Sequence, residues 1–425
     1  MYQEIARELL HFIDNSPSCF HVIENIKKEL VNFQELKEED NWNLQPGGSY
    51  YVSRNDSSLI AFSLPESSFD SYRIAAAHSD CPSFKIKANP EMTVEKHYTK
   101  LNVEKYGGMI LSSWLDRPLS AAGRLILKKD GKLLSKTVNI DRDLFLIPNV
   151  AIHMNRKLND GYVYNPQIDM LPLFGSGNAK LLPLAAKAAH VKAEEILSYD
   201  LFLYNRQKGV LWGADEEFIS SRSLDDLQSV YGILKGFSSA QRDGSHISIC
   251  AVFDNEEVGS LTKQGADSTF LRDTMDRIEE CLAFSTEKKK QMLAKSFMLS
   301  ADNAHALHPN HPELADPTNR PYLNEGIVIK HNANQKYTTD AFSEAVFRQI
   351  CEEADVPVQT YTNRSDIAGG STLGNLSNRH ISLNTVDIGL PQLAMHSSYE
   401  SAGVKDTAYL IQACKHFYSK KETLF

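Results

Sequence analysis

Short apolar runs alternate with amphipathic segments through the second half of the chain. Five runs are too short for long helices and are rich in β-branched or other apolar residues, which predicts buried strands: HISICAVFD, KSFMLSAD, EGIVIK, PVQTYTN and HISLNTVDIG. Between them, apolar residues recur at helical spacing in DLQSVYGILKGF, DTMDRIEECLAF, DAFSEAVFRQICEEA and DTAYLIQACKHF. Alternating strands and helices are typical of a sheet flanked by helices. We therefore predict an α/β fold built on a mixed sheet.

The first half of the chain has a different pattern. Residues 1–35 contain two helical patterns, and YRIAAAHSD is a strand candidate that ends in His78 and Asp80. From about residue 85 to 213, strand-like runs such as AGRLILKKDGKLLSKTVNI follow one another with KDGK and glycine turns. We interpret residues 89–213 as a β-rich domain inserted into an α/β domain that consists of residues 1–88 and 214–425.

Composition and charge exclude several classes of function. The chain has 425 residues, of which 42% are hydrophobic, and a formal net charge of −9. No lysine- and arginine-rich block opposes this charge, so nucleic acid is not expected as a partner. No run reaches the roughly 20 apolar residues that cross a bilayer, and the amphipathic N-terminus does not resemble a signal peptide. Six scattered cysteines without a CxxC pair indicate reduced thiols, so we expect a cytoplasmic protein.

Acids and histidines gather where the predicted strands end. Ligands of open α/β folds bind beyond the carboxyl ends of the strands. Taken singly, an acid at a helix start is often an N-cap, and a histidine after a strand is often a core residue. Together, several unpaired acids cannot share one dry edge without a cation. The residues concerned are His78 and Asp80 in AAAHSD, Glu256 and Glu257 in FDNEE, Asp302 in LSAD, Asp225 in SLDDL and His396 in LAMHS.

A divalent metal is the expected counter-charge, because no lysine or arginine lies close in sequence to FDNEE or LSADNAHA. Histidine and carboxylate ligands without cysteine favour zinc, with manganese or cobalt as substitutes. In HSD, alternate residues point to one face, so His78 can bind metal while Asp80 holds its second ring nitrogen. Of the two glutamates, Glu257 is expected to bind metal and Glu256 to take a proton from water.

The longer motifs resemble the aspartyl aminopeptidase family, whose relatives include the vacuolar aminopeptidase of yeast and which belongs to the two-zinc exopeptidases. The resemblance runs from about residue 72 to 400 and rests on HSDCPSFKIK, WLDRPLSAAGR, IPNVAIHMNR, LDDL, DNEEVGS, SADNAHALHPN, IKHNANQKYTTDA, SDIAGGSTLG and DIGLPQLAMHS. It implies that His78, Asp225 and Asp302 bind one zinc. Asp225, Glu257 and His396 would bind the other, so that Asp225 bridges. The family motif is usually LDN, whereas this chain has LDD, which adds Asp226.

The resemblance also implies roles outside the metal ligands. Glu256 matches the general base, and Asp80 the carboxylate behind His78. The inserted domain corresponds to a dimerisation domain, in which His153 matches a histidine that reaches the neighbouring subunit's active site; a structural histidine is the alternative. The segment IKHNANQKYTT, with Lys330 and Tyr337, resembles the lining of the first side-chain pocket in acid-preferring members, where Lys330 could pair with a substrate carboxylate; a surface lysine at a strand end is the alternative. The glycines of AGGSTLG, Gly370 among them, let backbone approach the substrate or a neighbouring subunit. The family assembles as a dodecamer built from dimers.

These observations predict a cytoplasmic, zinc-dependent aminopeptidase that removes the N-terminal residue from peptides. Asp or Glu is slightly favoured as that residue, and an apolar residue is the alternative. Its cofactors would be two zinc ions per subunit. One alternative is a metal-dependent deacylase or carboxypeptidase, for which Arg364 in YTNRSD is the nearest clamp for a substrate carboxylate. Another is a non-catalytic assembly protein that retains the fold.

Overall fold

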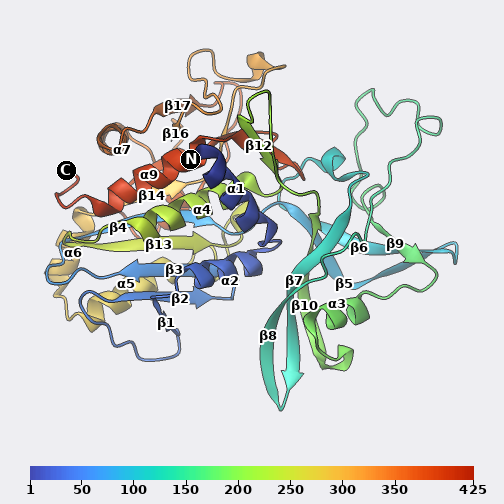
Figure 1. Ribbon diagram of the computed structural model, residues 1–425, viewed down its shortest axis with the longest axis horizontal. Helices are drawn as coiled ribbons and strands as arrows, with labels where there is room; N and C mark the ends of the chain where they lie inside the picture. Colours follow the sequence, from blue (N-terminus) through green and yellow to red (C-terminus); the bar gives the residue numbers. More distant parts are fainter.

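The computed structural model describes residues 1–425 and contains three β-sheets (Figure 1). The largest sheet has nine strands in the order β1-β2-β3-β13-β4-β14-β18-β16-β17. Its strands are β1 (Gln34–Leu36), β2 (Ser49–Arg54), β3 (Ser58–Ser63), β13 (His246–Phe253), β4 (Ser71–His78), β14 (Phe297–Ala301), β18 (Asn384–Gly389), β16 (Ile327–His331) and β17 (Val358–Thr362). The sheet is mixed, as predicted.

The centre of this sheet consists of four parallel strands, β13, β4, β14 and β18. Strand β3 pairs antiparallel with β13 on one side, and β16 pairs antiparallel with β18 on the other. Every residue of β13 and β14 is buried, which explains why these segments are continuous apolar runs rather than alternating ones. Because the central strands run in one direction, their carboxyl ends meet at one edge.

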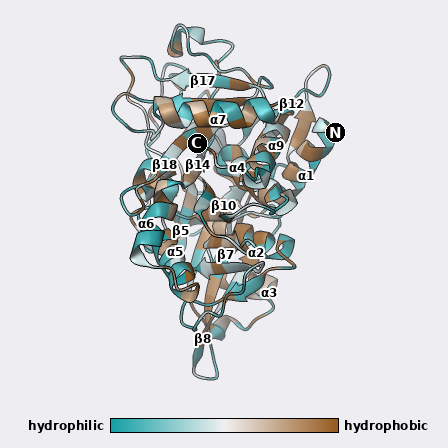
Figure 2. Ribbon diagram, turned by 90° about the vertical axis from the view of Figure 1, so that its left-hand side faces the viewer, coloured by the Kyte–Doolittle hydropathy of each residue, from teal (hydrophilic) through white to brown (hydrophobic).

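Helices cover both faces of the nine-stranded sheet and bury two separate hydrophobic cores. Alternate strand residues divide between the cores: Ala75 and Ala77 of β4 face one, whereas Ile74 and Ala76 face the other. The first core includes α1 (Tyr2–Asp14), α2 (Cys19–Glu29), α4 (Leu224–Ser239), α7 (Ala341–Glu353) and α9 (Asp406–Ser419). The second includes α5 (Phe270–Cys281), α6 (Thr286–Ala294) and α8 (Leu373–Ser377). Figure 2 shows both hydrophobic and hydrophilic turns on α7, as expected for a helix with one buried face.

A six-stranded antiparallel sheet forms a second unit, to the right of the first in Figure 1, with its own core. Its strand order is β8-β7-β10-β5-β6-β9. The strands are β5 (Ser83–Val94), β6 (Tyr98–Tyr106), β7 (Leu119–Lys129), β8 (Lys132–Asn139), β9 (Leu173–Ser176) and β10 (Ile196–Asn205), and the unit also contains η1 (Leu111–Trp114), α3 (Leu181–Ala189) and η2 (Ala193–Glu195). We call residues 83–205 the β-rich unit; the predicted boundary at residue 89 falls inside β5.

A small sheet joins distant parts of the chain between the two units. Its five strands have the order β11-β12-β20-β19-β15, so that β12, which follows the β-rich unit, pairs with β20 near the C-terminus. The strands are β11 (Val210–Trp212), β12 (Phe218–Ser221), β20 (Glu400–Gly403), β19 (Pro391–Leu393) and β15 (Ala304–His305). No helix of the structure is long and apolar enough to span a membrane.

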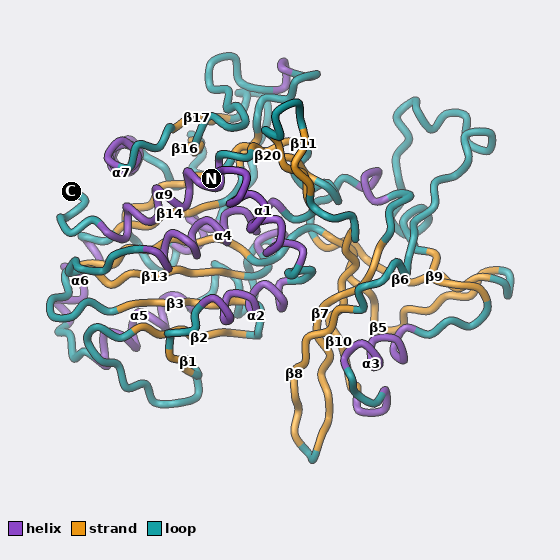
Figure 3. The backbone as a smooth tube through the Cα atoms, viewed as in Figure 1, coloured by secondary structure: helices purple, strands orange, loops and turns teal.

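Residues 140–172 contain neither a helix nor an extended strand and form a long loop between β8 and β9 (Figure 3). Several large apolar side chains on this loop are exposed, and Met154 and Val163 retain 83% and 85% of their accessible surface. Exposed apolar residues that gather on one segment indicate a surface that contacts another protein.

Helix α4 packs against α9 through two glycines one turn apart. A side chain at Gly232 would meet the flexible end of Leu410 at 2.5 Å, whereas one at Gly236 would overlap the Cβ atom of Cys414 and the α9 backbone. The two helices therefore approach more closely than larger residues would permit. This contact matters for the site, because the first turn of α4 carries Asp225.

Replacing Gly236 by alanine tests this packing. Alanine is the better helix former by about 1 kcal/mol, and overpacking costs about 1–3 kcal/mol. Because the added methyl group at Gly236 would overlap a Cβ atom and backbone rather than a side-chain end, we take the upper end of that cost and expect Gly236→Ala to lower the free energy of unfolding by about 2 kcal/mol. Gly232→Ala, which meets only a movable side-chain end, should lose less. Urea denaturation of both variants measures the difference, and a Gly236→Ala protein as stable as the wild type would contradict the close contact.

Candidate metal centre

The predicted ligands lie at the carboxyl edge of the central parallel strands. His78 is the last residue of β4, and Asp302 follows β14 directly. Glu256 and Glu257 lie in the short 3₁₀ helix η3 (Glu256–Val258), which follows β13. Since β13, β4 and β14 are parallel neighbours, these side chains leave the sheet at the same edge.

Asp225 lies between two groups of ligand-type side chains. Its Oδ1 atom is 3.5 Å from Nε2 of His78, and the same nitrogen is 3.8 Å from Oδ1 of Asp302. Its Oδ2 atom is 3.4 Å from Nε2 of His396, which is also 3.4 Å from Oε2 of Glu257. All five predicted metal ligands thus come together, and the two oxygens of one carboxylate face two different triads.

The charge in this cluster is poorly compensated by the protein alone. Asp225 is 2% exposed, and its Oδ1 atom, Oε1 of Glu257 and Oδ1 of Asp226 have no hydrogen-bond partner. Burial raises the pKa of Glu257 well above its ordinary value. Burial would also raise the pKa of Asp225, but the neighbouring imidazole groups of His396 and His78 lower it overall.

Buried carboxylate oxygens without partners cost free energy unless a cation pairs with them. Ligand atoms of His78, Asp225, Asp226 and Asp302 lie within 4.8 Å of one another, as do those of Asp225, Glu257 and His396. Such groups of imidazole nitrogens and carboxylate oxygens, without thiolates, fit zinc. The residues present therefore fit one divalent metal in each triad, and Asp226 adds a further carboxylate beside His78, Asp225 and Asp302.

Glu256 occupies a third grouping, with ligand atoms within 4.8 Å of those of His78 and Glu257. Burial is the main cause that raises its pKa to about 8. Glu256 is thus adjacent to one member of each triad, His78 and Glu257, and belongs to neither triad.

Asp80 makes hydrogen bonds to both glutamates and to His78. Its carboxylate accepts hydrogen bonds from the backbone N–H groups of Glu256 (3.1 Å) and Glu257 (3.2 Å). The Nδ1 atom of His78 lies 3.0 Å from the backbone oxygen of Asp80 and 3.4 Å from its carboxylate. Asp80 thus holds the second nitrogen of His78 chiefly through its carbonyl group. Its carboxylate fixes the turn of residues 255–258, which carries Glu256 and Glu257 and which we call the glutamate turn.

Lys330 is 2% exposed and points into the acid cluster. Its ammonium group donates to the backbone oxygen of Asp302 (2.9 Å), to Oδ2 of Asp302 (3.2 Å) and to the backbone oxygen of Asn303 (3.4 Å). These contacts use all three of its N–H groups. Lysine is therefore part of the counter-charge at Asp302, although no basic residue is close in sequence.

The other residues predicted to bind substrate differ in their surroundings and exposure. Tyr337 is buried, with its ring centre 5.3 Å from the Lys330 ammonium nitrogen. Gly370 lies in the loop before α8, with open space where a side chain would be. His153 is exposed on the loop of residues 140–172 and belongs to none of the metal-type groups of this subunit.

Two buried acids near the triads were not singled out as ligands or positioning groups from the sequence. Glu400, 1% exposed, accepts hydrogen bonds from the backbone N–H groups of His396 (2.7 Å) and Asp225 (3.1 Å). Asp226 is fully buried, and its Oδ2 atom accepts from the backbone N–H of His78 at 3.2 Å. In the sequence, only the departure from LDN to LDD draws attention to Asp226, and no local pattern indicates that Glu400 lies near the site.

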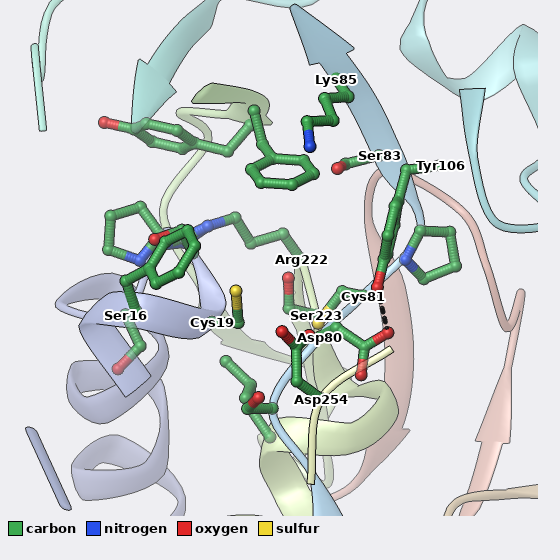
Figure 4. Close-up of a pocket in the computed structure, with 18 of the residues that line it drawn as sticks. Ser16, Cys19, Asp80, Cys81, Ser83, Lys85, Tyr106, Arg222, Ser223 and Asp254 are labelled. Atoms are coloured by element: carbon green, nitrogen blue, oxygen red, sulfur yellow. Dashed lines mark hydrogen bonds between the residues drawn. The ribbon is translucent and has the colours of Figure 1, made fainter. Parts of the chain in front are cut away.

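A cavity of about 390 Å³ lies behind the cluster, between α2, the β-rich unit and the loops after β4 and β13 (Figure 4). Of the five predicted ligands, only Asp225 lines it. Asp80 and Tyr106 lie side by side in its wall and are joined by a hydrogen bond (Figure 4). The cavity therefore reaches the metal centre at Asp225 and is lined on its other side by residues of the β-rich unit.

Comparisons with known proteins agree with this geometry. The model of the family described as aminopeptidase I zinc metalloprotease (M18) matches residues 12–418. A probable M18 family aminopeptidase 2 of Clostridium novyi is 47% identical, with 98% of this chain and 99% of the relative covered. Among solved structures, Ape4 in complex with Nbr1 is 34% identical with a TM-score of 0.95, over 98% of this chain and 86% of that one. The dodecamer of mApe1 from Saccharomyces cerevisiae is 27% identical with a TM-score of 0.87, over 98% and 97%. The chain therefore belongs to the M18 family of zinc metalloproteases and is a metalloaminopeptidase.

Proposed function

We propose that this chain removes the N-terminal residue of peptides with two zinc ions that share Asp225. The observation that carries the proposal is the position of Asp225, whose two oxygens face separate triads. His78 and Asp302 would complete the set for one ion, and Glu257 and His396 the set for the other. Three protein ligands per ion leave coordination positions open, as catalytic sites require. Manganese or cobalt could replace zinc in the same donor set.

Glu256 would perform the proton transfers. Bound zinc ions supply Lewis-acid chemistry, which polarises a peptide carbonyl and makes a water molecule more acidic. Glu256 would accept a proton from the attacking water and return it to the leaving amine. The Asp80 carboxylate, which accepts from the backbone of Glu256 at 3.1 Å, would hold this base in place.

The preferred N-terminal residue is a separate part of the proposal. A preference for Asp or Glu would require Lys330 to exchange a contact with Asp302 for the substrate carboxylate, because its N–H groups are already used. Tyr337 packs beside Lys330 and would line the same pocket, and Gly370 would leave room for the substrate backbone.

The geometry does not favour the carboxypeptidase alternative. Arg364, the nearest clamp for a substrate carboxylate, is bound to both carboxylate oxygens of Asp366 and to the backbone oxygen of Glu313. Its charge is therefore neutralised on an exposed loop. The non-catalytic alternative is not favoured either, because the predicted ligands and the predicted base form grouped, metal-compatible sets of side chains.

We also propose that the chain works in the cytoplasm as a homo-oligomer, assembled as a dodecamer from dimers. The exposed apolar side chains of residues 140–172 support an interface between copies. In such an assembly His153, on the same loop, would reach the metal centre of the neighbouring subunit and bind the substrate carbonyl.

A dipeptide panel tests the activity. We expect hydrolysis of Asp-, Glu- or Leu-aminoacyl dipeptides with a free amine and none of their N-acetylated forms. A preference for Leu would remove Lys330 from its proposed role. Hydrolysis of acetylated peptides would favour a deacylase.

The variant Glu256→Gln tests the base. It should lower kcat by about 10²–10⁴-fold, the contribution of a positioned general base, while zinc content stays unchanged. Near-normal activity of Glu256→Gln would contradict its role.

Metal removal tests the shared carboxylate. Because zinc would bind the folded chain in preference to the unfolded one, chelation should lower the free energy of unfolding by about 4 kcal/mol for each ion lost, relative to zinc at a thousand times the dissociation constant. Elemental analysis should find two zinc ions per chain, one after His396→Ala and none held tightly after Asp225→Ala. An Asp225→Ala variant that keeps both ions would contradict the bridge.

Co-expression of two inactive variants tests the role of His153. If His153 acts on the neighbouring subunit, a mixed dimer of His153→Ala and Glu256→Gln chains contains one site with both wild-type groups. We therefore expect activity above that of either variant alone. Activity equal to the mean of the two separate variants would show that His153 does not act in trans.

A further inference from the structure

The segment that leaves the β-rich unit at Tyr106 lies against the metal centre. Tyr106 is the last residue of β6, and the following residues, up to Ile110, lead into η1. This short stretch contacts Asp80, Asn255, Glu257 and His396, which belong to separate segments of the α/β unit. None of the residues 106–110 was predicted as part of the site.

The hydroxyl group of Tyr106 links Asp80 to Asn255, the residue before the two glutamates. It donates a hydrogen bond to Oδ2 of Asp80 at 2.6 Å (Figure 4) and accepts one from Nδ2 of Asn255 at 2.8 Å. Asp80 in turn accepts from the backbone of Glu256 and Glu257. Since Asn255 directly precedes Glu256, the hydroxyl holds the glutamate turn directly through Asn255 and indirectly through Asp80.

The glycines after Tyr106 allow the same segment to touch the ligands themselves. Gly107 has φ +78°, and a Cβ atom there would lie 3.1 Å from the Cβ atom of Glu257. A Cβ atom at Gly108 would lie 3.9 Å from Nδ1 of His396. The backbone N–H of Ile110 donates to the carbonyl oxygen of His396 at 3.0 Å. Glu257 and His396, which belong to the same group around Asp225, thus both lie next to this segment.

We propose that Tyr106 is a positioning residue for the metal centre, and that residues 106–110 of the β-rich unit hold Glu257, His396 and the base Glu256 in register. The inference rests on the proposed function, because it concerns the same metal centre. Partners of metal ligands that fix their orientation commonly change metal affinity or activity by about 10–100-fold. The β-rich unit therefore contributes to the site of its own subunit as well as to assembly.

Tyr106→Phe separates the hydroxyl group from the ring, whose centre lies 5.5 Å from that of Phe202 in an edge-on contact. The matched control is Tyr199→Phe, which removes a hydroxyl bound to the backbone oxygen of Lys87 at 2.6 Å within the same sheet. The measurements are the zinc dissociation constant, by competition with a chromophoric chelator, and kcat and KM. We expect zinc binding to weaken by about 10-fold or more and kcat to fall, with KM changed less than about twofold. The control should match the wild type.

Gly107→Ala gives a second, independent test. Its control is Gly131→Ala, because Gly131 has φ +77° but nothing within 4 Å of an added Cβ atom. Both variants carry the same backbone strain, and only the first would displace Glu257. We therefore expect weaker zinc binding in Gly107→Ala alone.

The outcomes separate this inference from the proposed function. If Tyr106→Phe binds zinc as tightly as Tyr199→Phe, or Gly107→Ala as tightly as Gly131→Ala, the positioning role is overturned while the aminopeptidase proposal stands. A wild-type chain that binds no zinc would overturn both. Weaker zinc binding in both variants, with unchanged controls and a normal wild type, supports the positioning role.

Discussion

One carboxylate between two triads determines how the rest of this structure is arranged. Asp225 is nearly inaccessible to water, and each of its oxygens faces a histidine, which in turn faces a second acid. A buried acid cluster of this kind is unfavourable unless cations enter it. The fold must therefore bring its acids together, leave them without protein partners on one side, and prevent them from moving apart when no cation is present.

The acids near the triads divide into two kinds according to what they bind. Asp225 and Glu257 keep oxygen atoms free of hydrogen bonds, which leaves these atoms available to a metal. Asp80 and Glu400 instead accept two backbone N–H groups each, from Glu256 and Glu257 and from Asp225 and His396. A side chain that binds backbone fixes where a loop lies, so the second kind holds the first kind in place without competing for the metal.

The strand ends were predictable because parallel neighbours present their carboxyl ends together. His78, Glu257 and Asp302 follow three buried apolar runs, and this local signal was sufficient to group them and to predict a mixed α/β sheet. Lys330, Glu400 and Tyr106 carry no such signal. Lys330 lies in an ordinary strand, and its role arises only because β16 pairs antiparallel with β18 and its long side chain reaches Asp302. Contacts between sequence-distant loops depend on the complete fold, so the residues that hold the site were harder to find than those that form it.

The place of the β-rich unit in the chain explains why it touches the metal centre. The unit begins at Ser83, just after Asp80, and its last strand ends at Asn205, from which the chain passes through β11 and β12 to Asp225. The segment that enters the β-rich unit therefore starts at Asp80, and the segment that leaves it leads to Asp225, so both adjoin the cluster. The chain returns a third time at the end of β6, where Tyr106 binds Asp80. A unit anchored at three points around one cluster cannot shift without moving His78, Asp225 or the glutamate turn. Contacts between copies of this chain through the β-rich unit would for this reason bear directly on the geometry of the metal centre.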